Sequence, residues 1–360
     1  MKRILVGGTG GTPSNNFIQS LREVPESFYI IGICSDPYDL CRANTEENYL
    51  VPYAYEEDYY LILKDIVKKT KPDFLHVQND IEVLAISRYR EKLWELGVKT
   101  FLPKHTSVET CVNKMKTYDK WRKAGFKVPK SMLIKTKEDL EIAFDEFGGE
   151  IWLRATVGGG GKGALPTRDF QFAKDWINFF DGWGKFMAAE RLTSQTVTWM
   201  SIWKDGDLLV AQGRKRLSWA FANRTLSGVT GITRVGVTIS DPIVDEIAQK
   251  AIFAIDSVPN GVWSVDMTYD KEGIPNPTEI NIGRFFTTHL FFSRAGLNMP
   301  YIIIKLAFNE KLPHISKKIN PLPSGLEWIR GMDFEPVLTT IDKVNELKES
   351  LEKRRRLLRE

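Results

Sequence analysis

A run of four glycines in the middle of the chain follows an apolar strand-like segment and is flanked by cations. The glycines occupy residues 158–161, Arg154 ends the preceding segment, and Lys162 and Gly163 follow. Backbone without side chains can approach phosphate oxygens closely and point N–H groups at them, while the two cations offset the negative charge. The run lacks the Gly-Lys-Ser/Thr ending of a Walker A loop. We interpret it as a phosphate-binding loop, because a flexible hairpin tip would explain the glycines but not the flanking cations.

Three side chains that carry oxygen lie in two later strand-like segments. Asp266 belongs to the first segment, and Glu279 and Asn281 belong to the second. Residues two apart in a strand point to the same face, so Glu279 and Asn281 can converge with Asp266 on a hard cation. Mg²⁺ suits such a site because it keeps few protein ligands and completes its shell with water and phosphate oxygens. An isolated Glu-x-Asn is more often a solvated strand face, and it is the glycine loop that favours a metal here.

Two further basic residues, Arg214 and Arg216, lie between these motifs. Their spacing places them on the same face of a strand, whereas Lys215 should point the opposite way. Arg214 or Arg216 could hold a phosphoryl group or a substrate carboxylate, and a basic strand edge that discourages aggregation explains them equally well. The sequence leaves both alternatives open.

The N-terminal segment Val-Gly-Gly-Thr-Gly-Gly-Thr-Pro partly matches a dinucleotide-binding turn, in which a strand runs through glycines into a helix. Gly8 and Gly10 fit the pattern, but Pro13 stands where its third glycine should lie. Asp36 ends the next strand-like segment, roughly where a ribose-binding acid is expected. A nicotinamide site is therefore a less favoured alternative to a turn that shapes the lobe or holds a small substrate.

Composition restricts the class of protein. The chain has 360 residues, 42% of them hydrophobic, which is enough for two or three folded lobes. Its net charge of +4 is too small to indicate a nucleic-acid surface. Three cysteines without a Cys-x-x-Cys pair argue against a zinc ribbon or a disulfide framework. No apolar run is long enough to cross a membrane, and we expect a cytoplasmic protein.

Alternating patterns predict the elements that position these motifs. Apolar strands alternate with helices in the first hundred residues, as in a parallel sheet covered on both faces. The following segments mix helices with antiparallel strands, which predicts α+β architecture. A final helix over 342–360 has too short an apolar stripe for a coiled coil, so we expect it to pack on the protein or lie in solvent. The other expected elements are strands at 4–6, 29–34, 74–77, 151–155, 196–203 and 262–268, and helices at 16–22, 59–70, 114–123 and 138–147.

The order of the motifs resembles the ATP-grasp superfamily of carboxylate–amine ligases, and most of all its carbamoyl-phosphate synthase large-chain type. The motifs are NKMKTYDKWRKAGFKVPKS from Asn113, LRATVGGGGKGA from Leu153, AERL from Ala189 and GVWSVDMTYDKEGIPNPTEINIGR from Gly261. The resemblance covers roughly residues 1–309, including the segment DFLHVQNDIEVLA in the first lobe. No single motif is decisive, whereas four in the correct order are.

The resemblance implies the fold: α/β plus α+β, with a Rossmann-like N-terminal lobe built on a parallel sheet and followed by a two-lobed ATP-grasp domain. The implied divisions are 1–103 for the pre-ATP-grasp domain, 104–186 for the lobe with the glycine loop, 187–310 for the lobe with the hinge and metal strands, and 311–360 for a C-terminal extension.

The resemblance also assigns roles to single residues. The implied nucleotide-binding residues are Lys114 and Arg154 at the phosphates, Gly159, Gly160, Gly161, Lys162 and Gly163 in a lid loop, and Glu190, Arg191 and Leu192 in a hinge strand against adenine. The implied ligands of one or two Mg²⁺ or Mn²⁺ ions are Asp266, Glu279 and Asn281. Arg284 would face the acceptor carboxylate or the acyl phosphate. Arg214 and Arg216, which are singled out by their spacing and not by the resemblance, are the other catalytic candidates.

The reaction implied joins a small-molecule carboxylate to an amine or ammonia through an acyl phosphate and releases ADP and phosphate. The chain could form a homodimer, and neither membrane nor nucleic-acid partners are expected. Two positions depart from the family pattern: Thr196, or Gln195 one residue earlier, stands where an acid usually follows the hinge, and residues 279–284 are one residue longer than Glu-x-Asn-Pro-Arg. A nucleotide-binding regulatory protein with weak turnover is therefore an alternative.

Two further positions are candidates for substrate contact. His289 follows Arg284 closely enough to reach a substrate, although a lone histidine is more often structural. Residues 227–231, rich in small and polar side chains, could form a substrate loop.

Overall fold

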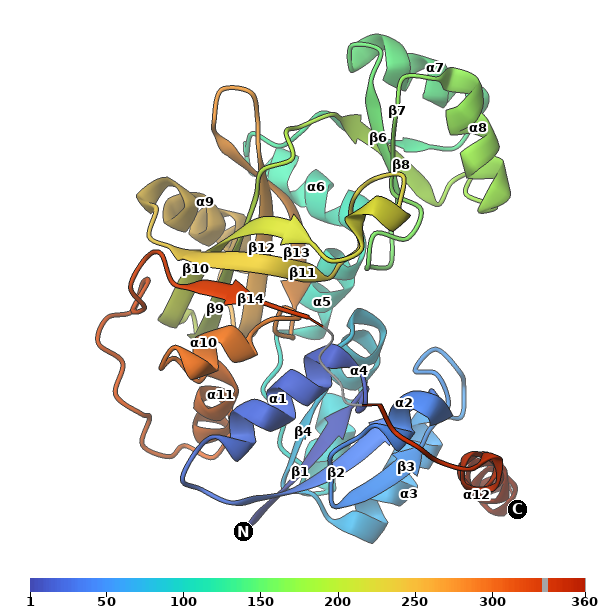
Figure 1. Cartoon of the computed structure of the whole chain (residues 1–360), viewed down its shortest axis with the longest axis vertical. Coiled ribbons are helices and arrows are strands. Elements are labelled where there is room, and N and C mark those ends of the chain that lie inside the picture. The colour runs from blue at the N-terminus through green and yellow to red at the C-terminus, as the bar shows by residue number, and fades with distance from the viewer. Residues whose placement is uncertain (332–335, 360) are drawn as a thin grey trace.

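The computed structural model describes residues 1–331 and 336–359, which form an N-terminal lobe, a small lobe and a large lobe (Figure 1). In the part of the chain that is described, each lobe is built on one sheet. The strand orders are β3-β2-β1-β4 in the N-terminal lobe, β5-β8-β6-β7 in the small lobe and β13-β12-β9-β10-β11-β14 in the large lobe. The combination of α/β and α+β architecture predicted from the sequence is confirmed.

The N-terminal lobe has a parallel sheet between helices. Its central strands are wholly apolar at 4–6 and 30–31, as strands covered on both faces must be. Its strands are β1 (Lys2–Gly7), β2 (Phe28–Cys34), β3 (Glu47–Leu50) and β4 (Phe74–His76), and its helices are α1 (Thr12–Arg22), α2 (Pro37–Cys41), α3 (Tyr59–Thr70) and α4 (Asp80–Glu95). The sequence reading missed β3, α2 and α4, although the side chain of Asn79 caps α4 in the usual way.

Packing accounts for the glycine turn after β1. Gly10 has a φ of +84°, and a Cβ added there would lie 1.7 Å from the carbonyl oxygen of Asp39 in α2. The Asp36 carboxylate caps the same helix by accepting hydrogen bonds from the backbone N–H groups of Tyr38 and Asp39. The two features that favoured a dinucleotide site thus have a structural role, which is to let α2 lie directly on the turn.

The small lobe is an antiparallel sheet covered by two helices. Its core contains Ile134, Leu140, Leu153 and Ile177, and the side chains of Thr136 and Asp139 form a capping box at the start of α7. Its elements are β5 (Ser131–Ile134), α7 (Lys137–Glu146), β6 (Ile151–Ala155), β7 (Leu165–Thr167), α8 (Phe170–Phe179) and β8 (Phe186–Glu190), and α5 (His105–Val112) and α6 (Lys114–Lys123) lead into it. The boundary after residue 186 that the resemblance implies falls at the first residue of β8. Because β8 pairs with both β5 and β6, this boundary would separate β8 from almost all of the sheet to which it belongs.

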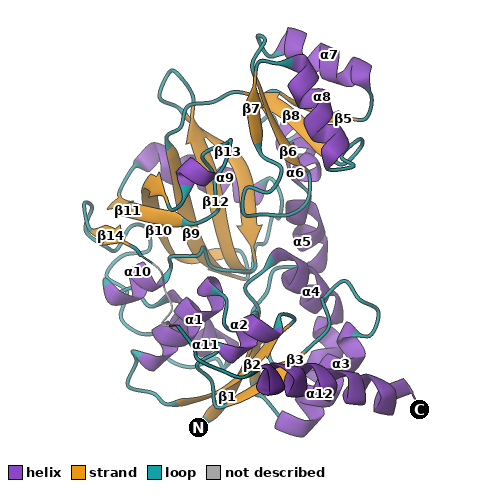
Figure 2. Ribbon diagram, turned by 45° about the vertical axis from the view of Figure 1, so that its right-hand side comes forward, coloured by secondary structure: helices purple, strands orange, loops and turns teal. Residues whose placement is uncertain are grey.

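The large lobe is a six-stranded sheet with helices on both faces (Figure 2). Its elements are β9 (Thr196–Lys204), β10 (Asp207–Trp219), the 3-10 helix η1 (Ala222–Arg224), β11 (Thr233–Ile239), α9 (Pro242–Phe253), β12 (Gly261–Tyr269), β13 (Pro275–Ile282), α10 (Leu290–Arg294), α11 (Met299–Ala307) and β14 (Glu327–Ile329). Along β9, Trp199 and Trp203 share a core with α9, whereas Met200 and Ile202 share a core with α10 and α11. The face of the sheet that carries Met200 and Ile202 also carries the polar residues of the candidate site.

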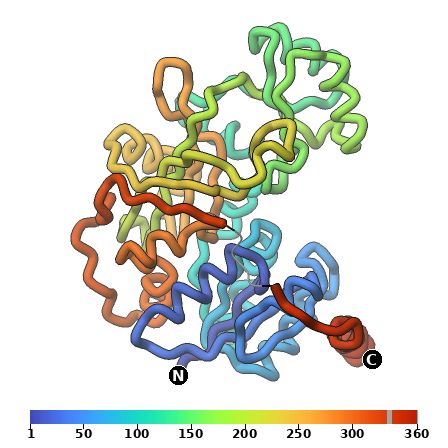
Figure 3. Tube along the Cα trace, in the orientation of Figure 1, coloured from blue at the N-terminus to red at the C-terminus, as the bar shows by residue number. Residues whose placement is uncertain are grey.

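The C-terminal extension joins two lobes instead of forming one of its own. The strand β14 pairs with β11, and α12 (Ile341–Arg359) packs on the N-terminal lobe through buried Val344 and Leu351 (Figure 3). Arg355 donates hydrogen bonds of 2.7 Å to the carboxylates of both Glu56 and Asp58. The expected packing of the last helix is confirmed, and its predicted end at residue 360 lies outside the described residues. None of the helices in the described ranges is long and apolar enough to cross a membrane.

The contact at Gly10 predicts a specific loss of stability. Gly10→Ala should lower the free energy of unfolding by about 3 kcal/mol, because the left-handed φ and the clash with α2 both cost energy. Gly125→Ala is the matched control, since Gly125 has a φ of +74° but nothing within 4 Å of an added Cβ. It should lose only about 1 kcal/mol. Urea denaturation measures both values, and equal losses would contradict the packing role of Gly10.

Candidate active site

The register of the large sheet aligns four polar side chains in one row. Arg214 of β10 is paired with Thr198 of β9, Thr198 with Asp266 of β12, and Asp266 with Glu279 of β13. Side chains directly opposite on neighbouring strands share a face and lie close together. The row therefore places a cation, a hydroxyl and two carboxylates along one line across the sheet.

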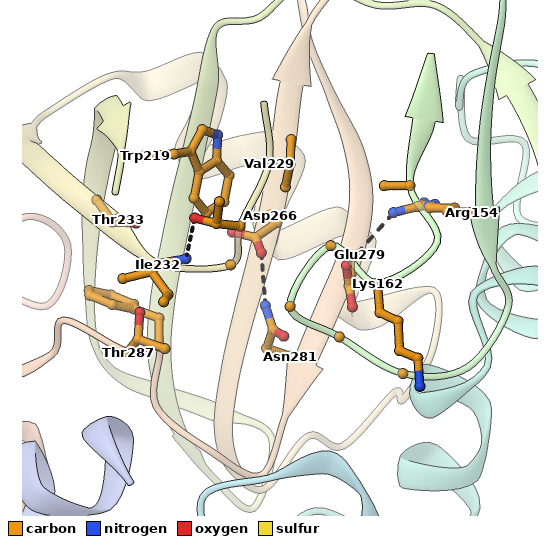
Figure 4. Close-up of a pocket in the computed structure, with 18 of the residues that line it drawn as sticks. Arg154, Lys162, Trp219, Val229, Ile232, Thr233, Asp266, Glu279, Asn281 and Thr287 are labelled. Carbon is orange, nitrogen blue, oxygen red and sulfur yellow. Dashed lines mark hydrogen bonds and ion pairs between the residues drawn. The ribbon is translucent and has the colours of Figure 1, made fainter. Parts of the chain in front are cut away.

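The three predicted metal ligands lie together at the end of this row (Figure 4). The Asp266 carboxylate accepts hydrogen bonds from the Thr198 hydroxyl and, at 2.8 Å, from the Asn281 amide. The described ranges contain no group of three His, Cys, Asp or Glu side chains suited to a metal, so a metal site here would need the amide oxygen of Asn281, which accepts a hydrogen bond from Arg284, beside Asp266 and Glu279. Oxygen atoms of two carboxylates and one amide are ligands that suit Mg²⁺.

Two cations reach this site from outside the large lobe. Asn113 caps α6 and thereby places Lys114 at its first turn, where its Nζ lies 3.3 Å from Glu279 Oε1 and donates to the Gly158 carbonyl at 2.6 Å. Arg154, at the end of β6, lies 3.7 Å from Glu279 Oε2 and donates to the Thr278 carbonyl at 2.8 Å. Lys114 and Arg154 therefore face Glu279 across the cleft, and their binding of phosphate stays a prediction.

The glycine loop covers the site and touches a second loop. Gly159, Gly160, Gly161 and Lys162 line the cavity, with the Lys162 side chain exposed at its rim. A Cβ added to Gly161 would lie 2.5 Å from the carbonyl oxygen of Val229, so residues 227–231 pack directly against the loop. Gly163, in contrast, does not line the cavity. A Cβ there would lie 2.8 Å from the ring of Phe186, which gives Gly163 a packing role.

Arg214 is a buried cation, Arg216 is largely buried, and the two do not form an exposed edge. Arg214 is 1% exposed, and its guanidinium donates to the hydroxyls of Thr198, Thr233 and Thr288. Burial, helped by repulsion from Arg216, lowers the pKa of Arg214 to about 9, which leaves it charged at neutral pH. A substrate anion would relieve this repulsion. The structure thus favours the anion-binding alternative over the basic edge.

The side chains of Arg216 and Lys215 point to opposite faces of β10, as their spacing from Arg214 predicts. Arg216 donates to the Thr196 hydroxyl at 2.6 Å and stacks on the ring of Trp219, with 3.7 Å to the ring centroid. Lys215 points away from the cavity and donates to Gln195. The Thr196 hydroxyl therefore positions Arg216.

Arg284 links the site to the N-terminal lobe. Its guanidinium donates to both carboxylate oxygens of Asp80, at 2.5 and 3.1 Å, and to the Asn281 amide oxygen. Burial would raise the pKa of Asp80, but the charge and hydrogen bonds of Arg284 outweigh it and lower the pKa. Arg284 is thus paired with Asp80, which lies 204 residues away in the sequence and was not among the predicted site residues.

A second cavity adjoins the first along the hinge strand. This hinge pocket has a volume of 310 Å³ and is lined by Glu190, Arg191 and Leu192 together with Trp152 and Met267. The carboxylate of Glu190 accepts a hydrogen bond from the backbone N–H of Lys130, and Arg191 lies over the ring of Trp152. The predicted hinge residues therefore border a slot with apolar walls next to the polar site.

The suggestion that His289 contacts a substrate is wrong for this structure. His289 is 0% exposed, donates from Nδ1 to the Phe286 carbonyl and lines none of the cavities described here. Burial lowers its pKa to about 4, so it is a neutral core residue at pH 7. Four residues that the sequence did not single out, Asp80, Thr198, Thr233 and Trp219, do contribute to the site.

The central cavity that results is strongly basic. Its volume is 360 Å³, and six basic side chains and two carboxylates line it: Lys114, Arg154, Lys162, Arg214, Arg216 and Arg284 against Asp266 and Glu279. It shares Trp152, Arg154 and Glu279 with the hinge pocket, so the two cavities adjoin one another. A polyanion with a flat ring at one end would complement both shape and charge.

Solved structures with the same architecture place the fold in a known class. The biotin carboxylase domain of the Hydrogenobacter thermophilus 2-oxoglutarate carboxylase, in complex with MgADP and bicarbonate, matches with a TM-score of 0.69 at 16% identity, over 91% of this chain and 73% of that one. N5-carboxyaminoimidazole synthetase from Staphylococcus aureus, complexed with ADP, matches with 0.65 at 15% identity, over 87% and 79%. L-amino acid ligase from Bacillus licheniformis matches with 0.64 at 12% identity, over 87% and 75%.

These likenesses show that the chain has the ATP-grasp fold, as the order of its motifs suggested. No protein-family model matches the chain. At such low identities the likeness concerns the fold, and the chemistry must be argued from the site itself.

Proposed function

We propose that this protein is an ATP-dependent ligase that joins a carboxylate to an amine or ammonia through an acyl phosphate and releases ADP and phosphate. The observation that carries the proposal is the central cavity, in which six basic side chains, two carboxylates and a glycine loop surround a space that adjoins the hinge pocket. A triphosphate bound to a divalent cation needs this combination of charges, and a purine ring fits the slot.

The nucleotide would lie across both cavities. Adenine would occupy the hinge pocket beside Glu190 and Leu192, and the phosphates would lie under the glycine loop between Lys114 and Arg154. Asp266, Glu279 and Asn281 would hold one or two Mg²⁺ ions, or Mn²⁺, which act as Lewis acids on the phosphate oxygens. The named relatives of the same fold, one of them solved with MgADP, support this placement.

The chain's own residues supply the other requirements of phosphoryl transfer. A carboxylate that approaches ATP is repelled, so its charge and that of the phosphates must be neutralised and held in line. Arg214 is buried and donates hydrogen bonds to three threonine hydroxyls, and Arg216, which is largely buried, lies 4.0 Å from a carboxylate oxygen of Asp266. Both would bind the acceptor carboxylate. The glycine loop and residues 227–231 pack over the site and would keep water from hydrolysing the acyl phosphate.

Two alternatives differ in what they require. A nicotinamide-dependent enzyme would use the turn at Gly8 and Gly10, but this turn is packed against α2. A regulatory protein with the same fold would bind ATP without turnover, and Thr196 in place of an acid is the observation that keeps it open. The carbamoyl-phosphate synthase-like type, the cytoplasmic location and a homodimer remain predictions from the sequence.

The metal strands provide the first test of turnover. Mg-ATP is incubated with panels of carboxylates, bicarbonate, amines and ammonia, and ADP release is measured. We expect at least one combination to stimulate release and Glu279→Ala to reduce kcat by at least 100-fold, because it removes a carboxylate that orients the metal. Glu272→Ala, in the exposed turn between the same two strands, is the matched control and should keep full activity.

Outcomes of that screen separate the alternatives. Full activity in the Glu279→Ala variant would contradict the ligase proposal. Binding of ATP without acceptor-stimulated ADP release, in the wild type, would favour the regulatory alternative.

The contact between the two loops provides a second test. Gly160 and Gly161 have φ values of +69° and +72°, so alanine strains the backbone equally at both positions. Only at Gly161 would the added Cβ push against Val229. Gly161→Ala should therefore weaken the affinity for Mg-ATP at least fivefold more than Gly160→Ala, as measured by calorimetry. Equal affinities of the two variants would show that closure of these loops does not contribute to nucleotide binding.

A further inference from the structure

A third cavity opens at the carboxyl ends of the parallel strands in the N-terminal lobe. This N-lobe pocket has a volume of 410 Å³, enough for a molecule of amino-acid size, and Gly8, Tyr53 and Glu82 are among the residues that line it. Ligands of open α/β sheets bind at this edge of the sheet. The pocket shares Gly158, Gly159 and Arg284 with the central cavity, so a molecule bound in it would lie beside the place proposed for the phosphoryl group.

The inner wall of the pocket holds a buried carboxylate without a cation. Glu82 is 6% exposed and accepts hydrogen bonds from the Tyr59 hydroxyl at 3.2 Å and the Asn79 amide at 2.5 Å. Both partners are neutral, and within residues 1–331 and 336–359 no basic side chain forms an ion pair with Glu82. A carboxylate buried in this way is costly unless it takes up a proton or a cation pairs with it.

Other titratable groups around Glu82 do not supply that charge. Burial raises the pKa of Tyr59 well above its usual value and that of Cys34 to about 12, so both are neutral. Asp80, on the same helix, is already paired with Arg284. Burial raises the pKa of Glu82 itself to about 7, which means that the carboxylate can take up or release a proton near neutral pH.

The rim of the pocket is aromatic and is held in place from outside. The rings of Tyr53 and Tyr55 are stacked, with centroids 5.4 Å apart and planes 2° apart, and both are exposed. Glu56 accepts a hydrogen bond from the Tyr53 backbone N–H, and Arg355 of α12 binds the same carboxylate. Aromatic faces attract cations, so the aromatic rim and the carboxylate of the inner wall both favour a positively charged ligand.

From this geometry we infer that the N-lobe pocket binds the amine substrate as its ammonium cation, with Glu82 as the counter-charge and Tyr53 and Tyr55 at the entrance. The inference rests on the proposed ligase function and specifies its nucleophile as a primary amine with an apolar or aromatic substituent. The connection with the central cavity would let that amine reach the acyl phosphate.

The same carboxylate completes the chemistry of the amine. An ammonium ion has no free electron pair, so it first gives one proton to Glu82 and becomes a neutral amine. The nitrogen lone pair then forms the C–N bond at the acyl carbon while the C–O bond to phosphate breaks. The second proton of the amine leaves with the departing phosphate as hydrogen phosphate, and Glu82 later returns its proton to solvent.

Direct binding of a probe tests the inference without any turnover. Benzylammonium and its neutral counterpart benzyl alcohol are titrated into the full chain at pH 7.5, without nucleotide, and binding is followed by saturation-transfer NMR. We expect the wild type to bind benzylammonium and the nearly isosteric Glu82→Gln variant to bind it at least tenfold more weakly, with no change for benzyl alcohol. Glu91→Gln, on the exposed side of the same helix, is the matched control and should bind like the wild type.

A second variant guards against a folding defect at the buried position. Tyr53→Ala combined with Tyr55→Ala changes only exposed rings and should weaken benzylammonium binding about threefold or more. Failure of the wild type to bind benzylammonium would overturn the inference, as would unchanged affinity in a folded Glu82→Gln variant. Either result can occur while ADP release still responds to amines. The binding experiment therefore tests the N-lobe pocket alone, and the ADP-release screen tests the ligase proposal.

Discussion

The constraint on which the site depends is the placement of two carboxylates directly opposite each other on β12 and β13. Asp266 and Glu279 repel one another unless other groups offset their charge. The hydroxyl of Thr198 and the amide of Asn281 stabilise Asp266, and Lys114 and Arg154 approach Glu279 from the facing side of the cleft. Ion pairs with Glu279 therefore hold Lys114 and Arg154 against the large sheet, on the side where we propose that phosphate and a divalent metal bind.

Contacts distant in sequence join this centre to the N-terminal lobe. Arg284 bridges Asn281 on the metal strand and Asp80 at the start of α4, and Glu82 lies two residues beyond Asp80. The helix α4 thus presents one acid to the central cavity through Arg284 and another to the N-lobe pocket. The same short segment thus connects the walls of both cavities, as our proposal of an amine bound in one and an acyl phosphate formed in the other requires.

Local spacing was enough to predict part of the site. The glycine loop and the pair Glu279 and Asn281 depend on neighbouring residues and on the period of a strand, and the structure places them together as expected. Asp80 could not be found in this way, because its role comes from a partner 204 residues away. Nor could the importance of Glu82, which depends on burial and on the absence of a cation nearby in the described chain. His289 was misjudged because closeness in sequence to Arg284 does not reveal that its ring faces the core.

The most direct test of the account is a crystal structure of the protein with Mn²⁺ and a non-hydrolysable ATP analogue, in which anomalous scattering locates the metal. We predict a manganese peak within coordination distance of the Glu279 carboxylate and the Asn281 amide oxygen, with the β- and γ-phosphates between that ion and the amides of residues 159–161. A nucleotide whose phosphates lie beside the glycine loop but contact neither metal strand, or a metal bound elsewhere, would contradict it.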